Sequence, residues 1–245
     1  MDLSPASEQA AALTADQSAA FLAGKLRRQE PFFFLRYGDG AIECMTGKEG
    51  MTCDREQYSV DLGAKLMAAW RAIVGGPNVY IGDWRSASFD GVDDKSRYSD
   101  HYETLLAGHT PQFLHFEALL LMRESPSLLE FYRAVKQDRR EKVFMGPREC
   151  AGAAKMMGAR HIETPMRELH LWLPSLTLRL KSRPWDVLLY GAGMAGNLPA
   201  IEVWQEHPER TFINLGSAMD PLWRGRTRRQ QISQQRAREF FKELL

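Results

Sequence analysis

Apolar residues recur at helical spacing along several stretches of the chain. Residues 8–28 combine this spacing with many good helix formers, and the pattern stops before Pro31. Residues 55–73 place their large apolar side chains on one face, and a Gly-Gly-Pro-Asn sequence follows. We therefore predict a helix in each stretch. The same spacing predicts further helices near residues 117–136, 149–158, 166–181 and 195–206.

Short apolar runs of strand length lie between these helical patterns. The first, Phe32 to Tyr37, is largely aromatic and stops at Gly38-Asp39-Gly40. Further strands are predicted at residues 79–83, 112–116, 142–145, 185–190 and 211–215. Because short apolar strands alternate with helices, we predict an α/β fold with a mainly parallel, Rossmann-like central sheet flanked by helices.

Most of the predicted strands end in small residues. Gly38-Asp39, Gly146-Pro147, Gly191-Ala192-Gly193 and Gly216-Ser217 each follow a strand directly. In open parallel sheets, ligands bind beyond the carboxyl ends of the strands. We therefore expect these four corners to converge on one cleft.

Composition is that of a globular protein, with 44% hydrophobic and 26% charged residues in 245 positions. No linker is evident, so we expect a single domain over residues 1–245. Within it, residues 1–30 form an N-terminal helical segment and residues 222–245 a basic C-terminal helix. This last segment carries seven basic side chains against two acidic ones.

Several classes of protein are disfavoured by the sequence. No apolar run approaches the roughly 18 to 20 residues of a membrane span, and the N-terminus lacks a basic, then apolar, leader. We expect a cytoplasmic protein with reduced thiols, since Cys44, Cys53 and Cys150 have neither disulfide-framework nor zinc-site spacing. HExxH, GxSxG and P-loop motifs are missing, which disfavours zinc hydrolases, serine esterases and P-loop NTPases.

Asp39 is the first candidate for chemistry. The flanking glycines let the backbone turn sharply and approach a ligand. A carboxylate held at a sheet edge suits Mn²⁺ or Mg²⁺ on a diphosphate, and Glu43 shares a helical face with Asp39 if a helix begins near Gly40. Alternatively, Asp39 caps that helix and Glu43 favours its N-terminal dipole.

Arg36 lies inside the aromatic run, where an unpaired guanidinium is costly. Its anionic partner is either a ligand phosphate or a carboxylate such as Asp39 or Asp83. A structural ion pair and a phosphate clamp both fit the pattern.

Gly191, Gly193 and Gly196 match a GxGxxG pattern between a strand and a helix, where backbone N–H groups favour phosphate. The acid expected about 20 residues later could only be Glu209, which precedes the next strand, so a dinucleotide site is weakly supported. The alternative is that small residues are needed where helix and strand pack closely.

The segment from Gly216 to Pro221 precedes a cluster of arginines, which could bind a diphosphate or a polyanionic acceptor. A solvated basic face is the alternative.

His115 and His170 are the histidines best placed for a cleft, although a hydrogen-bonded structural role is the more common one.

The segment FFFLRYGDGAIECMTG resembles the FxxxRYGDGE segment of glycosyltransferases with the GT-D fold. Later strand-end sequences of the chain resemble that family's motifs in the same order, so the resemblance covers residues 31 to about 229. It implies sugar transfer from a nucleotide diphosphate donor, with a DxE motif serving metal and donor. Asp39 matches the first acid, but Ala41 stands at the second. Either Glu43 or Asp83 substitutes, or Asp39 and the donor alone hold the metal, or the activity is lost or changed.

These observations lead to one main hypothesis, a Mn²⁺- or Mg²⁺-dependent glycosyltransferase using a nucleotide sugar such as a UDP-sugar. The acceptor hydroxyl would belong to a glycan, a protein or DNA, including a hydroxymethylated base, and the enzyme could form a homodimer. A non-catalytic nucleotide- or glycan-binding module is the alternative, and a nicotinamide enzyme ranks third. The catalytic candidates are Asp39, also the metal ligand, Glu43 and Asp83. The donor-binding candidates are Arg36, Tyr37, Gly38, Gly40, Gly191, Gly193, Met194, Ser217 and Asp220. The acceptor or phosphate candidates are His115, Arg224, Arg226 and Arg228.

Overall fold

A computed structural model describes residues 13–52, 56–86, 104–106, 108–121, 125–223 and 233–243. The strands are β1 (Phe33–Arg36), β2 (Val79–Asp83), β3 (Gln112–His115), β4 (Lys142–Pro147), β5 (Arg160–Thr164), β6 (Val187–Tyr190) and β7 (Thr211–Asn214). The α-helices are α1 (Ala15–Arg27), α2 (Asp39–Met45), α3 (Val60–Ile73), α5 (Pro126–Gln137), α6 (Ala151–Met156), α7 (Leu173–Lys181), α8 (Asn197–Glu206), α9 (Asp220–Trp223) and α10 (Gln234–Lys242). Short 3₁₀ turns are η1 (Trp84–Ser86), η3 (Arg148–Cys150) and η4 (Leu169–Trp172).

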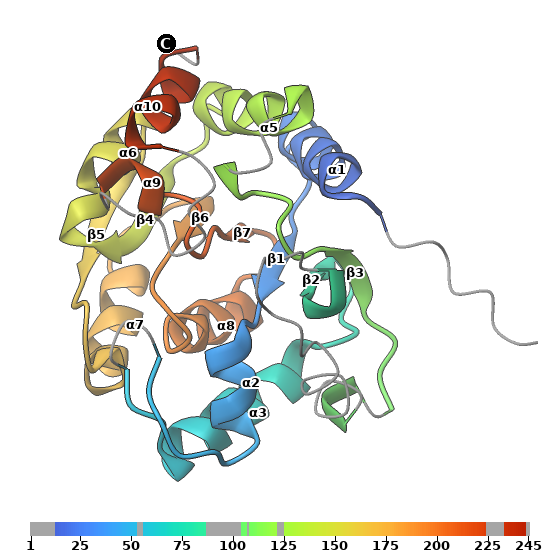
Figure 1. Ribbon diagram of the computed structural model, residues 1–245, viewed down its shortest axis with the longest axis vertical. Coiled ribbons are helices and arrows are strands. Elements are labelled where there is room, and N and C mark those ends of the chain that lie inside the picture. Colours follow the sequence, from blue (N-terminus) through green and yellow to red (C-terminus); the bar gives the residue numbers. More distant parts are fainter. Residues whose placement is uncertain are drawn as a thin grey trace, which may run out of the picture.

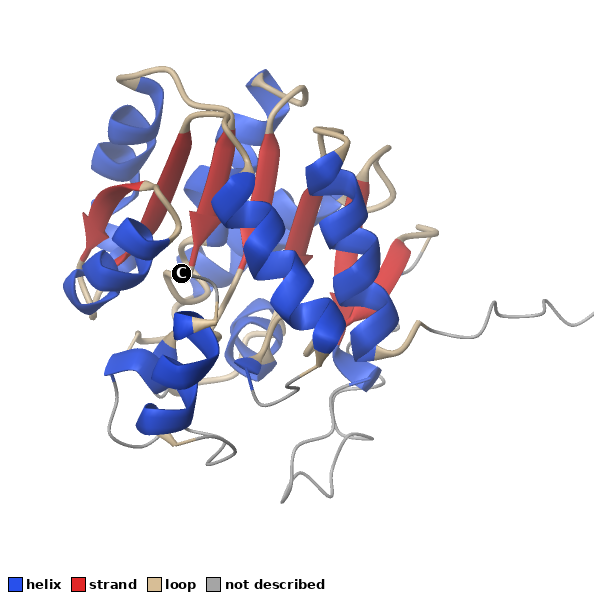
Figure 2. Ribbon diagram, turned by 90° about the horizontal axis from the view of Figure 1, so that it is seen from above, coloured by secondary structure: helices blue, strands red, loops and turns tan. Residues whose placement is uncertain are grey.

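All seven strands form one sheet in the order β3-β2-β1-β7-β6-β4-β5, and every pairing is parallel. Figure 2 shows the strands side by side with helices in front of and behind them. The prediction of an α/β fold with a parallel central sheet flanked by helices is therefore confirmed.

The helices cover both faces of the sheet (Figure 1). One apolar cluster lies between the sheet and α1, α5, α6 and α10, and the other lies between the sheet and α2, α3, α7 and α8. Strand β1 contributes to both, because Phe33 and Leu35 face one cluster while Phe34 faces the other. A strand buried on both faces has to be apolar throughout, which is why the aromatic run was recognisable in the sequence.

Local signals explain where several helices begin. The side chain of Thr14 caps α1 in a capping box with Gln17, and Ser59 and Ser125 accept backbone N–H bonds at the starts of α3 and α5. The helix predicted over residues 117–136 was placed too early, since residues 116–119 form a turn and α5 begins at Pro126. Proline suits the first helical position because its missing N–H would have had no partner there.

The C-terminal helix α10 packs Ala237, Phe240 and Phe241 into the apolar cluster on the face of the sheet that α1 and α5 cover. Both phenylalanine rings lie edge-on to Tyr132 of α5. Its polar residues include Arg236, which lies within ion-pair distance of Glu239 and Glu243. Among the described residues, no helix is both long enough and apolar enough to cross a membrane.

Candidate functional site

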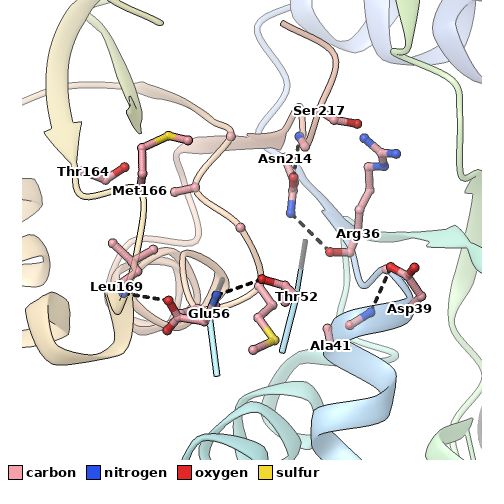
Figure 3. Close-up of a pocket in the computed structure, with 18 of the residues that line it drawn as sticks. Arg36, Asp39, Ala41, Thr52, Glu56, Thr164, Met166, Leu169, Asn214 and Ser217 are labelled. Carbon is pink, nitrogen blue, oxygen red and sulfur yellow. Dashed lines mark hydrogen bonds between the residues drawn. The ribbon is translucent and has the colours of Figure 1, made fainter. Parts of the chain in front are cut away.

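A cavity of about 340 Å³ lies at the carboxyl ends of β1, β7, β6, β4 and β5. All four strand-end corners singled out in the sequence contribute to its wall, through Asp39, Pro147, Gly193 and Ser217 among others. Parallel strands bring their carboxyl ends to one edge, so residues more than 170 positions apart meet there. Figure 3 shows 18 of the residues that line the cavity.

The floor of the cavity is held by a buried network of amides. Asn214, the last residue of β7, donates from Nδ2 to the backbone oxygen of Arg36 (3.2 Å) and to Oδ1 of Asn197 (2.8 Å). Asn197 donates to the same Arg36 oxygen (3.2 Å) and accepts from the hydroxyl of Tyr190 (2.9 Å). The Asn214 side chain also accepts from Gly216 N (2.8 Å). The network ties together the ends of β1, β6 and β7, which makes this part of the cavity rigid.

Arg36 is 6% exposed and lines the cavity. Its Nη1 donates to Leu215 O (3.0 Å), and its guanidinium lies 4.2 Å from the centre of the Phe116 ring. Gly216 has φ +53°, and a Cβ there would lie 2.6 Å from Arg36 Nη1. The glycine is thus needed for both its backbone conformation and the space beside the guanidinium.

Asp39 stands in the first turn of α2, whose N-cap is Gly38. Its Oδ1 accepts from Gly40 N (2.9 Å), and its carboxylate lines the cavity. A helix does begin near Gly40, but its N-cap is Gly38, so the alternative in which Asp39 caps the helix is wrong. Gly40 permits close packing, since a Cβ there would meet Thr52 Cγ2 at 2.9 Å and Tyr58 Oη at 3.2 Å.

Glu43 also lines the cavity, one helical turn after Asp39. Its carboxylate accepts from Lys48 Nζ and Tyr58 Oη, both at 3.1 Å. Burial, followed by the negative charge of Glu43, raises the pKa of Tyr58, so this hydroxyl stays protonated and donates.

Three of the catalytic, donor-binding and acceptor candidates lie away from the cavity wall. Asp83 is buried at the end of β2, and Tyr37 is buried in the core with its ring 5.0 Å from that of Trp70. His115 accepts from Glu117 N at Nδ1 (3.1 Å), a local structural bond. The predicted phosphate contacts Arg224, Arg226 and Arg228 lie outside the described residues.

The sequence suggested two roles for the glycines of the β6–α8 turn, phosphate binding and close packing. In the structure, different glycines fit each role. A Cβ on Gly191 would lie 2.7 Å from Gly216 O, and one on Gly196 would lie 2.6 Å from Ala192 Cβ, so both serve close packing. Gly193 has φ +62° and no atom within 4 Å of its Cβ position, and it lines the cavity with Met194. This part of the turn is open to a ligand.

Glu56 lines the cavity and was not recognised in the sequence. It is 6% exposed, and its carboxylate accepts from Leu169 N (2.8 Å), His170 N (3.0 Å) and His170 Nδ1 (2.7 Å). These bonds attach the segment between α2 and α3 to η4. His170, the second histidine candidate, is therefore engaged with a cavity carboxylate.

Whether these residues suit a divalent cation depends on how many ligands the protein must supply. Among the described residues, no group of three or more His, Cys, Asp or Glu side chains is arranged to hold a metal ion. Mg²⁺ is commonly bound by one or two carboxylates, with phosphate oxygens and waters completing the shell. Asp39 fits that second arrangement, because it is an acidic residue that lines the cavity together with Arg36.

No protein-family model matches the chain, and no curated protein matches it. Two similar solved structures are both of a domain of unknown function, number 1792. One, described as having a distinct glycosyltransferase fold, aligns with a TM-score of 0.61 and 14% identity, covering 87% of this chain and 80% of its own. The other, the selenomethionine-substituted structure, aligns with a TM-score of 0.60 and 14% identity, covering 84% and 78%. At this identity the likeness shows the fold alone, and that fold is glycosyltransferase-like.

Proposed function

We propose that this chain is a glycosyltransferase that moves a sugar from a nucleoside diphosphate sugar, such as a UDP-sugar, to an acceptor hydroxyl. The observation that carries the proposal is the cavity at the strand ends of a glycosyltransferase-like fold, with Arg36 and Asp39 side by side in its wall. The resemblance of the β1–α2 segment to the GT-D motif supports the same reading.

Transfer leaves negative charge on the departing diphosphate, so the site has to stabilise an anion. Arg36 supplies a fixed positive charge in a nearly dry position, where electrostatic interactions are strong. The turn at Gly193 and Met194 precedes α8, and backbone N–H groups at such a helix start favour phosphate. The diphosphate would therefore lie between β1 and β6.

Asp39 is the residue that would hold Mn²⁺ or Mg²⁺ against the diphosphate. Such an ion, when bound, neutralises charge on the phosphate oxygens. One oxygen of Asp39 accepts a hydrogen bond from Gly40 N, which fixes the orientation of the carboxylate.

Glu43 is proposed as the second carboxylate, in place of the acid that Ala41 lacks. It faces the cavity one turn from Asp39, whereas Asp83 does not line it. The bonds from Lys48 and Tyr58 orient the Glu43 carboxylate, which could act as a metal ligand or as a base toward the acceptor hydroxyl.

The acceptor is proposed only as a hydroxyl compound. A hydroxymethylated DNA base was suggested by the arginines that follow α9, and these arginines lie outside the described residues. The DNA acceptor therefore stays a prediction from the sequence.

Hydrolysis of the donor in the absence of an acceptor tests the proposal. We expect the wild type to release nucleoside diphosphate from at least one of a panel of UDP-, GDP-, ADP- and CDP-sugars with Mn²⁺. Glu43→Gln should lower that kcat by at least about 100-fold, the usual contribution of acid–base catalysis. Lys48→Met removes one of the two bonds to Glu43 but keeps the carboxylate and its bond from Tyr58, so it should lower kcat far less than Glu43→Gln.

Saturable donor binding without hydrolysis would favour the alternative, a non-catalytic binding module. Equal loss of activity in Lys48→Met and Glu43→Gln would contradict a chemical role of Glu43 that is separate from its ion pair with Lys48.

A further inference from the structure

The cavity has two chemically different ends. Its wall runs from β1 to β5, four strand spacings apart, which corresponds to about 19 Å. In Figure 3, Arg36 and Asp39 lie on one side, while Thr164, Met166 and Leu169 lie on the opposite side. The first end is charged and the second is mainly apolar.

Thr164 ends strand β5 and pairs in register with Pro147 of β4. The residue is 3% exposed, and its Oγ1 has no hydrogen-bond partner among the described residues. It lines the cavity. A buried hydroxyl without a partner is costly, and such groups are few in folded proteins. The hydroxyl is therefore best explained by a ligand that supplies the missing bond.

The surroundings of Thr164 restrict the chemistry of that ligand. Pro147, Pro165, Met166 and Leu169 give this end of the cavity an apolar wall. The nearby carboxylate of Glu56 already accepts from the backbone of η4. A sugar, with hydroxyls on every side, would leave many of them without partners here, and a phosphate would find no cation among these side chains. A flat heterocycle with a hydrogen-bonding edge fits both the apolar wall and the single hydroxyl.

We propose that the β5 end of the cavity binds the nucleobase of the donor and that Thr164 Oγ1 hydrogen-bonds to the edge of the base. This inference rests on the proposed function, which sets the diphosphate near Arg36 and Gly193. The donor then lies across the strand ends, with its base at β5 and its diphosphate toward β1. Thr164 is a specificity-determining residue in this arrangement.

The test compares the binding of nucleoside diphosphates and inorganic pyrophosphate by titration calorimetry with Mn²⁺. Thr164→Val keeps the branched shape and removes the hydroxyl. It should weaken binding of the nucleoside diphosphate that the wild type prefers by about threefold to tenfold, the usual effect of one neutral hydrogen bond. The affinity for pyrophosphate, which has no base, should not change. Thr164→Ser should retain the wild-type order of preference among UDP, GDP, ADP and CDP.

Thr177→Val is the matched control, because Thr177 is a buried threonine of α7 whose hydroxyl donates to Glu202 (3.1 Å) away from the cavity wall. It should leave both affinities unchanged. The inference is overturned if Thr164→Val weakens pyrophosphate as much as the nucleotide, or if it leaves the nucleotide affinity unchanged. If the wild type binds pyrophosphate but no nucleoside diphosphate, the proposed function fails as well.

Discussion

Gly216 shows how a single residue without a side chain positions a charged one. Its left-handed backbone and the short distance from its Cβ position to Arg36 Nη1 leave no room for any other residue. Arg36 is held from three sides, by Leu215 O, by the ring of Phe116 and by this glycine. The guanidinium is therefore oriented before any ligand arrives, which lowers the entropic cost of binding an anion.

Gly216→Ala should destabilise the fold by about 2 to 4 kcal/mol, from backbone strain and from overpacking against Arg36. Gly47→Ala is the control, since Gly47 also has positive φ (78°) but nothing within 4 Å of its Cβ position. Its cost should be about 1 kcal/mol, from strain alone. Urea unfolding measures both. Equal losses would mean that the contact with Arg36 carries no energetic weight.

At the residue scale, the sequence predicted those site residues that are unusual within their own short segment. Arg36 and Asp39 stood out because a charge in an aromatic run and an acid between glycines are unusual in themselves. Glu56 and Thr164 could not be found in this way. The carboxylate of Glu56 acquires its role from Leu169 and His170, 113 and 114 positions away, and Thr164 from its place opposite Arg36.

At the scale of elements, Glu56 joins two segments that border the cavity. The chain between α2 and α3 is fixed to η4 through the backbone N–H groups of Leu169 and His170. Since both segments line the cavity, this attachment holds two parts of its wall together.

Glu56→Ala should cost about 2 to 4 kcal/mol, because it leaves two backbone donors without their acceptor. Amide exchange at Leu169 and His170 should become faster than in the wild type. Glu206, which is 51% exposed and pairs with Lys181, provides the control, and Glu206→Ala should destabilise the fold far less than Glu56→Ala, because surface ion pairs contribute little. Unchanged exchange at both amides in Glu56→Ala would rule out the proposed attachment.

Strand β5 was missed in the sequence for a physical reason. It is an edge strand, and its residues Arg160, His161 and Glu163 are polar and partly or fully exposed. Most of the predicted strands were recognised by largely apolar runs, which arise when both faces of a strand are covered. An edge strand with polar side chains gives no such run. Because β5 was not predicted, the apolar end of the cavity was not predicted either.

At the scale of the whole molecule, the order of the strands decides which residues can act together. β1 lies beside β7 at the centre, and the cavity extends from there toward β5. β2 lies on the other side of β1, which explains why Asp83 does not reach the cavity wall. Its local sequence, an acid after a glycine at a strand end, is nevertheless similar to that of Asp39. Local sequence predicted the strands and their glycine corners, but the order of strands depends on contacts between distant segments.

The most direct test of the central claim is the thermal stability of the wild type and Asp39→Ala with a panel of nucleotide sugars and Mn²⁺. A ligand at about 100 times its Kd adds about 2.7 kcal/mol, which for a chain of this size raises Tm by roughly 5 to 10 °C. We expect that rise for at least one nucleotide sugar with the wild type, and its loss in Asp39→Ala. No rise with any nucleotide sugar, or an equal rise in the variant, would contradict the account.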